Sequence, residues 1–303
     1  MRLHDFKTLP VPAASRRLHS RGKALWLNEV LFTIKASRPG FWLTAIWFYL
    51  LPLGRTLPLS SFDFWLGLVY VALPLGLVIY AANDLTDERT DSLNPRKDSF
   101  LFGARPTPQQ IANLPLRIIL VQVPFLMILC WFLGPRALVW FGAVVGITTL
   151  YNVGAKNRPF FDTIAQVGYL TVFVLAHWLN NVPFAAWQLW VFGALFAMHS
   201  HLFGEIMDIE PDRAAERQTS AVVIGTRSTK LVVAALLVVE TFLATTIAHK
   251  PWLPFVLAMG AILFLLDAAI GWRERSYPTS LVAAFFVGWN FFLLAEIGLT
   301  LAR

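Results

Sequence analysis

Apolar residues follow one another in long runs along this chain, and short polar stretches separate the runs. A helix needs about 20 mostly apolar residues to cross the hydrocarbon core of a membrane. Nine segments approach this length, at residues 39–56, 63–82, 112–133, 136–152, 162–180, 185–204, 229–248, 252–271 and 279–301. The pattern predicts an all-α fold, in which nine transmembrane helices form a single domain over residues 39–303.

Composition supports a membrane protein. Hydrophobic residues make up 57% of the chain and charged residues only 14%, and both values depart from those of soluble domains in this direction. The formal net charge of +7 fits the surplus of Lys and Arg in cytoplasmic loops of polytopic membrane proteins. The expected partner is therefore the lipid bilayer, and no nucleic-acid partner is expected. Residues 1–38 form a basic N-terminal segment, with Arg16, Arg17, Arg21 and Lys23, that is expected to lie on an anionic membrane surface or to be a solvated tail.

The distribution of positive charge predicts the orientation. With nine spans, 21 of the 25 Lys and Arg residues fall on the same side as the N-terminus. Positive charge gathers on the cytoplasmic side of membrane proteins. We therefore expect an integral membrane protein whose N-terminus and long loops, at residues 83–111 and 205–228, are cytoplasmic.

The first of these loops opens with an acidic cluster. Residues 83–91 read N-D-L-T-D-E-R-T-D. If they continue the preceding helix, Asn83, Asp87 and Asp91 lie along one stripe, and so do Asp84, Asp87 and Asp91. Carboxylates this close repel one another, most strongly near hydrocarbon. Oxygen ligands of this kind suit Mg²⁺, so the cluster predicts a magnesium site.

The second loop begins with a similar cluster. Glu205, Asp208 and Asp212 are spaced i, i+3 and i+7. Pro211 lacks a backbone N–H and is expected to break or bend the helix between the two aspartates. The alternative for each cluster is a set of ordinary solvated loop charges. Because both clusters adjoin a span on the same face, we favour a bundle with one acidic site on each side of a central cavity.

Basic residues share this face. Lys156 and Arg158 follow the fourth span, and Arg96 and Lys97 follow the first acidic cluster. They are candidates for holding phosphate oxygens, or they only set the topology. The 25 Phe, 12 Trp and 6 Tyr include rings able to stabilise a carbocation. Together these features fit a diphosphate ester with an apolar tail, with the tail inside the bundle and the diphosphate at its cytoplasmic mouth.

These residues match a family pattern. Residues 83–91 resemble the N-D-x-x-D-x-x-x-D motif of the UbiA superfamily of intramembrane prenyltransferases, and residues 208–212 resemble its second motif, D-x-x-x-D. Residues 151–156 and 37–39 are similar to its basic loop and its short Arg-Pro element. The resemblance covers nearly the whole chain. It implies a nine-helix bundle around a cavity open to the membrane, with Mg²⁺ bridging both motifs and a prenyl diphosphate.

The resemblance also implies roles for individual residues. Asp84, Asp87 and Asp208 are the expected catalytic acids, with Asp84 supporting the first metal. Lys156, Arg158 and Arg38 would bind the diphosphate. The expected metal ligands are Asn83, Asp87, Asp91, Asp208 and Asp212. The chain departs from the family at Glu216, where many members have a small residue or glycine, and Pro211 leaves the ligand geometry open.

The implied activity is Mg²⁺-dependent transfer of an isoprenyl group from an allylic prenyl diphosphate to a small or lipophilic acceptor, with release of diphosphate. The sequence does not identify the prenyl acceptor. Aromatic acids, quinone precursors, tetrapyrroles, glycerol phosphates and polyenes are all used in the family. The alternative is a UbiA-type terpene cyclase, which needs no acceptor. Rivals from other classes are a cation-coupled transporter and a non-catalytic scaffold.

Five further polar residues lie within the spans or close to their ends. Glu240, Asp267 and Glu296 are candidates for orienting an acceptor or acting as a base. The alternatives are helix-to-helix hydrogen bonding and a protonated buried acid. His199 and His201 precede the second cluster. Their i, i+2 spacing puts them on different faces of a helix, so they are not expected to share a metal ion.

Overall fold

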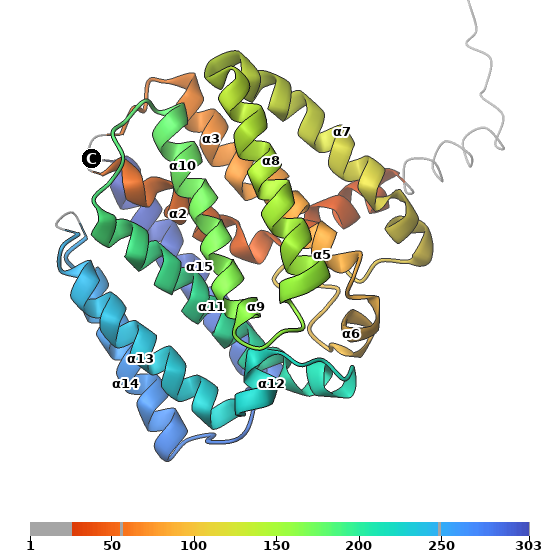
Figure 1. Ribbon diagram of the computed structural model, residues 1–303, viewed down its shortest axis with the longest axis vertical. Coiled ribbons are helices and arrows are strands. Elements are labelled where there is room, and N and C mark those ends of the chain that lie inside the picture. Colours follow the sequence, from red (N-terminus) through yellow and green to blue (C-terminus); the bar gives the residue numbers. More distant parts are fainter. Residues whose placement is uncertain (1–25, 55–56, 248–249, 303) are drawn as a thin grey trace, which may run out of the picture.

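The computed structural model describes residues 26–54, 57–247 and 250–302, and within these ranges the chain is helical (Figure 1). The basic residues Arg16, Arg17, Arg21 and Lys23 lie outside the described residues. A helix over residues 26–36 is followed by these elements: η1 (Pro39–Phe41), α2 (Trp42–Leu50), η2 (Leu51–Leu53), α3 (Phe62–Ala72), α4 (Pro74–Gly76), η3 (Leu77–Ala81), α5 (Ala82–Asp84), α6 (Glu88–Leu93), α7 (Pro108–Leu133), α8 (Pro135–Leu150), η4 (Tyr151–Ala155), α9 (Phe161–Ile164), η5 (Ala165–Leu170), α10 (Thr171–Leu179), α11 (Trp187–Ala214), α12 (Ser220–Ile224), α13 (Thr226–Ala244), α14 (Leu253–Ala269) and α15 (Thr279–Leu301).

Each of the nine predicted spans is helical over most of its length. Within the described residues, five helical stretches are long and apolar enough to cross a membrane, namely Phe62–Asp84, Pro108–Leu133, Pro135–Ala155, Trp187–Ala214 and Thr279–Leu301. The other predicted spans are shorter or less apolar helices, and α14 is one of them. The all-α fold is confirmed, and the number of nine transmembrane helices stays a prediction.

Local signals explain where the helices begin and end. Thr107 caps α7, since its hydroxyl accepts a hydrogen bond from the Gln110 amide, and the Gln110 side chain accepts one from the Thr107 amide in return. This capping box satisfies two amide groups that a helix N-terminus leaves unpaired. Gly134, at φ 59°, ends α7, and Pro135 starts α8 at once. The resulting tight connection joins these two apolar helices at one end, from which they diverge in Figure 1.

Large aromatic side chains form the core of the bundle. Trp47, Tyr49, Phe64, Phe173 and Phe192 are fully buried and belong to one apolar cluster. Burying an aromatic side chain of this size contributes several kcal/mol, about 25 cal/mol per Å² of apolar surface, where water is the reference solvent. The short helices α6, α9 and α12 lie together at one end of the bundle (Figure 1). The two acidic clusters lie at this end.

Candidate active site

The first acidic cluster is divided between two short helices. The amide and the hydroxyl of Thr86 both donate to the Asn83 carbonyl oxygen, each at 3.0 Å, and this local bonding replaces the next turn of helix. Helix α5 therefore ends at Asp84, Asp87 stands at the N-cap of α6, and Asp91 lies within α6. The expectation of one continuous helical stripe was wrong, because the chain turns between the two halves.

The second cluster lies on one uninterrupted helix. Helix α11 continues through Pro211 to Ala214, so Asp208 and Asp212 lie one turn apart on the same face. The expected break at Pro211 was wrong. A proline removes only its own backbone N–H, and here the loss falls in the last turns of the helix, where the ladder of hydrogen bonds is about to end.

The two clusters meet in space. The Arg217 guanidinium contacts Asp87 of the first cluster and also lies 3.5 Å from an Asp212 oxygen of the second. Arg96, which follows the first cluster in the chain, pairs with Asp208 of the second. Each of these cations therefore connects the two stretches, which are more than 110 residues apart in the sequence. The convergence that the sequence analysis expected is present in the structure.

Asp84 orients two cations. Its side chain is 1% exposed, and its Oδ1 atom lies 3.2 Å from the Arg38 guanidinium and 2.8 Å from the Lys97 ammonium. Lys97 also binds an Asp91 oxygen at 2.7 Å. The second oxygen of Asp84, Oδ2, is buried and accepts no hydrogen bond from the described residues. Asp84 thus holds basic side chains in place and keeps one oxygen available for a further partner.

Lys156 is the cation of the basic loop that reaches the acids. Its ammonium lies 2.5 Å from Asp87 Oδ1, 2.7 Å from Asn83 Oδ1 and 2.7 Å from the Thr86 hydroxyl. Burial lowers the pKa of Lys156 to about 7, although the nearby Asp91 carboxylate favours the charged form. The π-helical turn η4 precedes it, and such turns are frequent at functional sites because they redirect one side chain.

The second cation predicted in the basic loop, Arg158, lies away from the acids. It is exposed and is not among the described residues that line the cavity. Arg217 was missed, and Arg96 and Lys97 were considered only as alternatives. The available signal was position, since Arg217 follows Asp212 by five residues in the loop after the second cluster.

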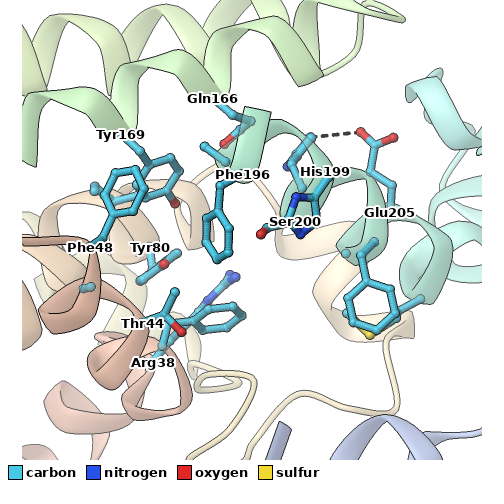
Figure 2. Close-up of a pocket in the computed structure, with 18 of the residues that line it drawn as sticks. Arg38, Thr44, Phe48, Tyr80, Gln166, Tyr169, Phe196, His199, Ser200 and Glu205 are labelled. Atoms are coloured by element: carbon cyan, nitrogen blue, oxygen red, sulfur yellow. Dashed lines mark ion pairs between the residues drawn. The ribbon is translucent and has the colours of Figure 1, made fainter. Parts of the chain in front are cut away.

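Behind the charged cluster lies a cavity of about 680 Å³. Asp87, Asp91, Asp208 and Asp212 line its mouth. Figure 2 shows the wall beyond, with Phe48, Tyr80, Tyr169, Phe196 and His199 among the side chains around the space. The inner part of the lining is mainly apolar and aromatic. The cavity therefore joins a charged mouth to an apolar interior.

The same cavity opens at the surface along α14. Phe255 and Leu263 line it and are 70% and 61% exposed. The Trp252 ring packs on Phe292 of α15, with centroids 5.0 Å apart, at one end of this helix pair. Phe203 packs on Phe264 and Phe285 at the other end, with centroids 5.7 and 5.0 Å apart. An apolar opening thus lies along α14 between two aromatic contacts.

Two of the carboxylates noted within the spans pair with lysines from other parts of the chain, Asp267 with one on α13 and Glu296 with one in the connection before α14. Asp267 binds Lys230 at 2.7 Å and accepts a hydrogen bond from the Tyr277 hydroxyl at 2.6 Å. Glu296 pairs with Lys250. Asp267 thus links α14 to α13, Glu296 links α15 to the connection before α14, and neither is among the described residues that line the cavity.

His201 belongs to a separate polar group. It lies 3.0 Å from Glu205, and Asp162 is close enough that the three side chains offer ligand atoms within 4.8 Å of one another. Both acids of this group already bind backbone amides. Asp162 binds the Ser220 amide at 2.7 Å, and Glu205 binds the Ala221 amide at 2.9 Å. The group anchors the start of α12, which is consistent with a structural role.

The donor set at the mouth fits Mg²⁺. Carboxylate and amide oxygens are the ligands that this ion prefers. Asn83, Asp87 and Asp91 come from one cluster, and Asp208 and Asp212 from the other. The free oxygen of Asp84 adds a further acceptor beside them. Neighbouring ammonium and guanidinium groups supply the charge that a phosphate ligand requires.

Fold and site together define a helical membrane protein with an anion-binding, metal-compatible mouth on an apolar cavity. The model of the UbiA prenyltransferase family matches residues 41–294, and the chain therefore belongs to this family and is a prenyltransferase. It is 27% identical to a lycopene elongase/hydratase of Corynebacterium glutamicum over 283 residues, which cover 86% of this chain and 95% of that protein. It is 29% identical to a lycopene elongase/hydratase of Haloferax volcanii over 219 residues, covering 67% and 68% of the two chains.

A solved structure has the same fold. It is a UbiA homologue from Archaeoglobus fulgidus bound to DMAPP and Mg²⁺, and it superposes with a TM-score of 0.64. The match covers 87% of this chain and 99% of that one, at 17% sequence identity. At this identity the likeness concerns the fold.

Proposed function

We propose that this protein is a Mg²⁺-dependent prenyltransferase that moves an isoprenyl group from a short allylic prenyl diphosphate to a polyene acceptor of the lycopene type, with release of diphosphate. The observation that carries the proposal is the meeting of the two acidic clusters at the mouth of an apolar cavity, where Arg217 contacts Asp87 and Asp212. A diphosphate ester with an apolar tail matches both parts of this cavity.

The residues at the mouth have two roles in the proposed reaction, metal binding and diphosphate binding. Asn83, Asp87 and Asp91 would hold one magnesium ion, and Asp208 and Asp212 another. When bound, Mg²⁺ neutralises charge on the departing diphosphate. Basic groups placed by the protein hold the phosphate oxygens and stabilise the negative charge that develops on them. These groups are Arg38, Arg96, Lys97, Lys156 and Arg217.

Asp84 has a different role in this scheme. It binds Arg38 and Lys97 through one oxygen, and so it fixes the direction in which both cations point. A positioned donor is worth more than a mobile one, because its reorganisation cost is already met in the folded protein. Asp84 therefore acts on the diphosphate through its two basic neighbours and supports the first metal site with its free oxygen.

The acceptor assignment is supported by the cavity and by the relatives. A polyene hydrocarbon has no polar group to hydrogen bond, so it is recognised by apolar surface alone. The opening along α14 presents such an apolar surface, which includes Phe255 and Leu263. Two relatives that align over two thirds or more of their length are lycopene elongase/hydratases. With the mouth on the side of the N-terminus, the proposed site faces the cytoplasm.

The test uses the full chain in lipid vesicles with dimethylallyl diphosphate, lycopene and Mg²⁺. The expected products are inorganic diphosphate and a polyene heavier by an isoprenyl unit, identified by mass spectrometry. Asp87→Asn and Asp208→Asn are expected to abolish both products. Glu88→Gln and Glu210→Gln are matched controls, because these exposed acids stand next to or near the proposed ligands.

Other outcomes separate the rivals. A cyclic product formed without lycopene identifies a terpene cyclase, and metal-dependent binding without diphosphate release identifies a transporter. Full activity in both aspartate variants contradicts the proposed metal sites.

A further inference from the structure

A histidine and a glutamate form a buried pair beside the cavity, away from the charged mouth. His199 Nδ1 on α11 lies 2.7 Å from Glu240 Oε1 on α13, and the Glu240 side chain is fully buried. His199 lines the cavity, and Figure 2 shows it on the wall near Phe196 and Ser200. The pair therefore has one member that faces the cavity and one that supports it from behind.

An ionised Glu240 selects one tautomer of the histidine. A carboxylate only accepts hydrogen bonds, so the Nδ1 atom that faces Glu240 then carries the hydrogen. The other nitrogen, Nε2, then holds a free lone pair. Among the described residues, no hydrogen bond involves Nε2. His199 thus offers an unprotonated nitrogen, and Glu240 keeps the ring in this orientation.

The position of the pair suits the acceptor more than the diphosphate. His199 precedes Asp208 by nine residues on the same helix, which places it about 13 Å further into the bundle at 1.5 Å per residue. The Phe196 ring lies 5.0 Å from the imidazole ring. The other basic side chains that line the described cavity are paired with carboxylates near the charged end, as follows: Arg38, Arg96, Lys97, Lys156, Arg217 and His201.

Prenyl transfer to a polyene needs a base. The bond between the allylic carbon and the diphosphate oxygen breaks, and its electron pair leaves with diphosphate. Attack by a carbon–carbon double bond of the acceptor on this allylic carbon forms the new carbon–carbon bond and leaves a carbocation on the acceptor. The reaction ends when a neighbouring C–H bond breaks, its electron pair forms a new double bond and the proton leaves. An apolar cavity supplies few groups that accept a proton. This step rests on the proposed function.

We propose that His199 is the catalytic base that takes this proton on Nε2, and that Glu240 is its positioning residue. The resulting imidazolium carries its charge next to the Glu240 carboxylate, and the attraction between opposite charges is stronger in a surrounding of low dielectric constant. Release of the proton to water or to diphosphate restores the neutral ring.

The experiment compares products and not only rates. In vesicles with dimethylallyl diphosphate, lycopene and Mg²⁺, His199→Gln and His199→Ala are expected to release diphosphate within about threefold of the wild-type rate, while the share of prenylated olefin falls about tenfold or more, since a positioned general base contributes at least about 10²-fold in many enzymes. Hydrated polyene and free prenyl alcohol replace the lost olefin. Glu240→Gln is expected to show a smaller shift in the same direction.

Two further measurements exclude a merely structural role. Added imidazole is expected to restore the olefin share in His199→Ala, because it supplies the missing base in the space left by the side chain. Glu296→Gln is the matched control, since it also removes a buried carboxylate that pairs with a basic side chain but does not line the cavity. It is expected to keep the wild-type product ratio and to show no response to imidazole.

The outcomes are distinguishable. If the wild-type protein yields no prenylated polyene, the proposed function fails, and the role of His199 fails with it. If the wild type yields the product and folded His199→Gln and His199→Ala keep the same product ratio, the role of His199 alone is overturned. Thermal unfolding in detergent identifies which variants are folded.

Discussion

Lys156 offers a direct measure of what one buried cation contributes to this site. Its ammonium contacts Asp87, Asn83 and Thr86 at 2.5 to 2.7 Å. Lys156→Met keeps most of the side-chain volume and removes the charge. Removing one partner of a buried ion pair costs about 3–5 kcal/mol. Asp87 also pairs with Arg217, so it keeps one cationic partner in the variant. We therefore expect the free energy of unfolding to fall by about 3 kcal/mol, the lower end of this range.

The effect on turnover is expected to be larger than stability alone explains. A preorganised donor that faces developing negative charge contributes about 2.7–4 kcal/mol, or about 10²–10³-fold in rate. We expect kcat/KM for the prenyl diphosphate to fall by this factor in Lys156→Met. Lys156→Arg is expected to recover part of it, because the charge returns with a different shape.

The assay measures diphosphate release in vesicles at several concentrations of prenyl diphosphate, with thermal unfolding in detergent as the check on folding. Arg158→Gln is the matched control, as this basic residue stands two positions away but is exposed and outside the cavity lining. It is expected to stay within about threefold of the wild type, as exposed charges contribute little. A folded Lys156→Met protein with wild-type kcat/KM refutes the role of this cation.

Three other predictions follow from the structure. Removing divalent cations with a chelator is expected to stop diphosphate release, and added Mg²⁺, but not Na⁺ at the same ionic strength, to restore it; activity that persists in the chelator contradicts the metal assignment. In Gly76→Ala, the new Cβ meets the Ser37 carbonyl oxygen at 2.7 Å, so the melting temperature is expected to fall with a cost of about 1–3 kcal/mol. Gly142→Ala, where no atom of the described residues lies within 4 Å of the new Cβ, is its control and is expected to show no loss. Glu216 has φ 62°, a conformation that costs a non-glycine residue about 1–2 kcal/mol, so Glu216→Gly is expected to keep or raise the melting temperature; a clear fall shows that the exposed contact with Arg89 outweighs this strain.

The fold was predictable because long apolar runs depart clearly from ordinary composition. The acidic residues were predictable for the same reason, since carboxylates next to membrane-length segments are rare and costly. Their detailed arrangement was not. Spacing gives a shared face only while the helix continues, and the Thr86 hydroxyl ends it by bonding the Asn83 carbonyl. At Pro211 the opposite happened, because α11 tolerates a proline in its last turns.

The cations were harder to predict for a physical reason. In the predicted nine-span topology, most of the 25 Lys and Arg residues fall on the side of the proposed site, where the positive-inside rule places basic residues whether or not they bind a ligand. On that side, the sequence does not distinguish a basic residue that binds a ligand from one that only sets the topology. Arg158 and Arg217 look equivalent in the sequence, yet Arg158 is exposed and Arg217 binds Asp87 and Asp212.

The carboxylates themselves separate the cations that serve the site from those that set topology. A buried acid cannot stay charged without a partner, so each acid of the mouth selects the basic side chains able to reach it. Asp84 selects Arg38 and Lys97, and Asp87 selects Lys156 and Arg217. These cations are therefore fixed where a diphosphate is expected to arrive. Removing the charge of any of these cations should weaken diphosphate binding. The same change at exposed Arg158 should alter only the positive charge of its loop.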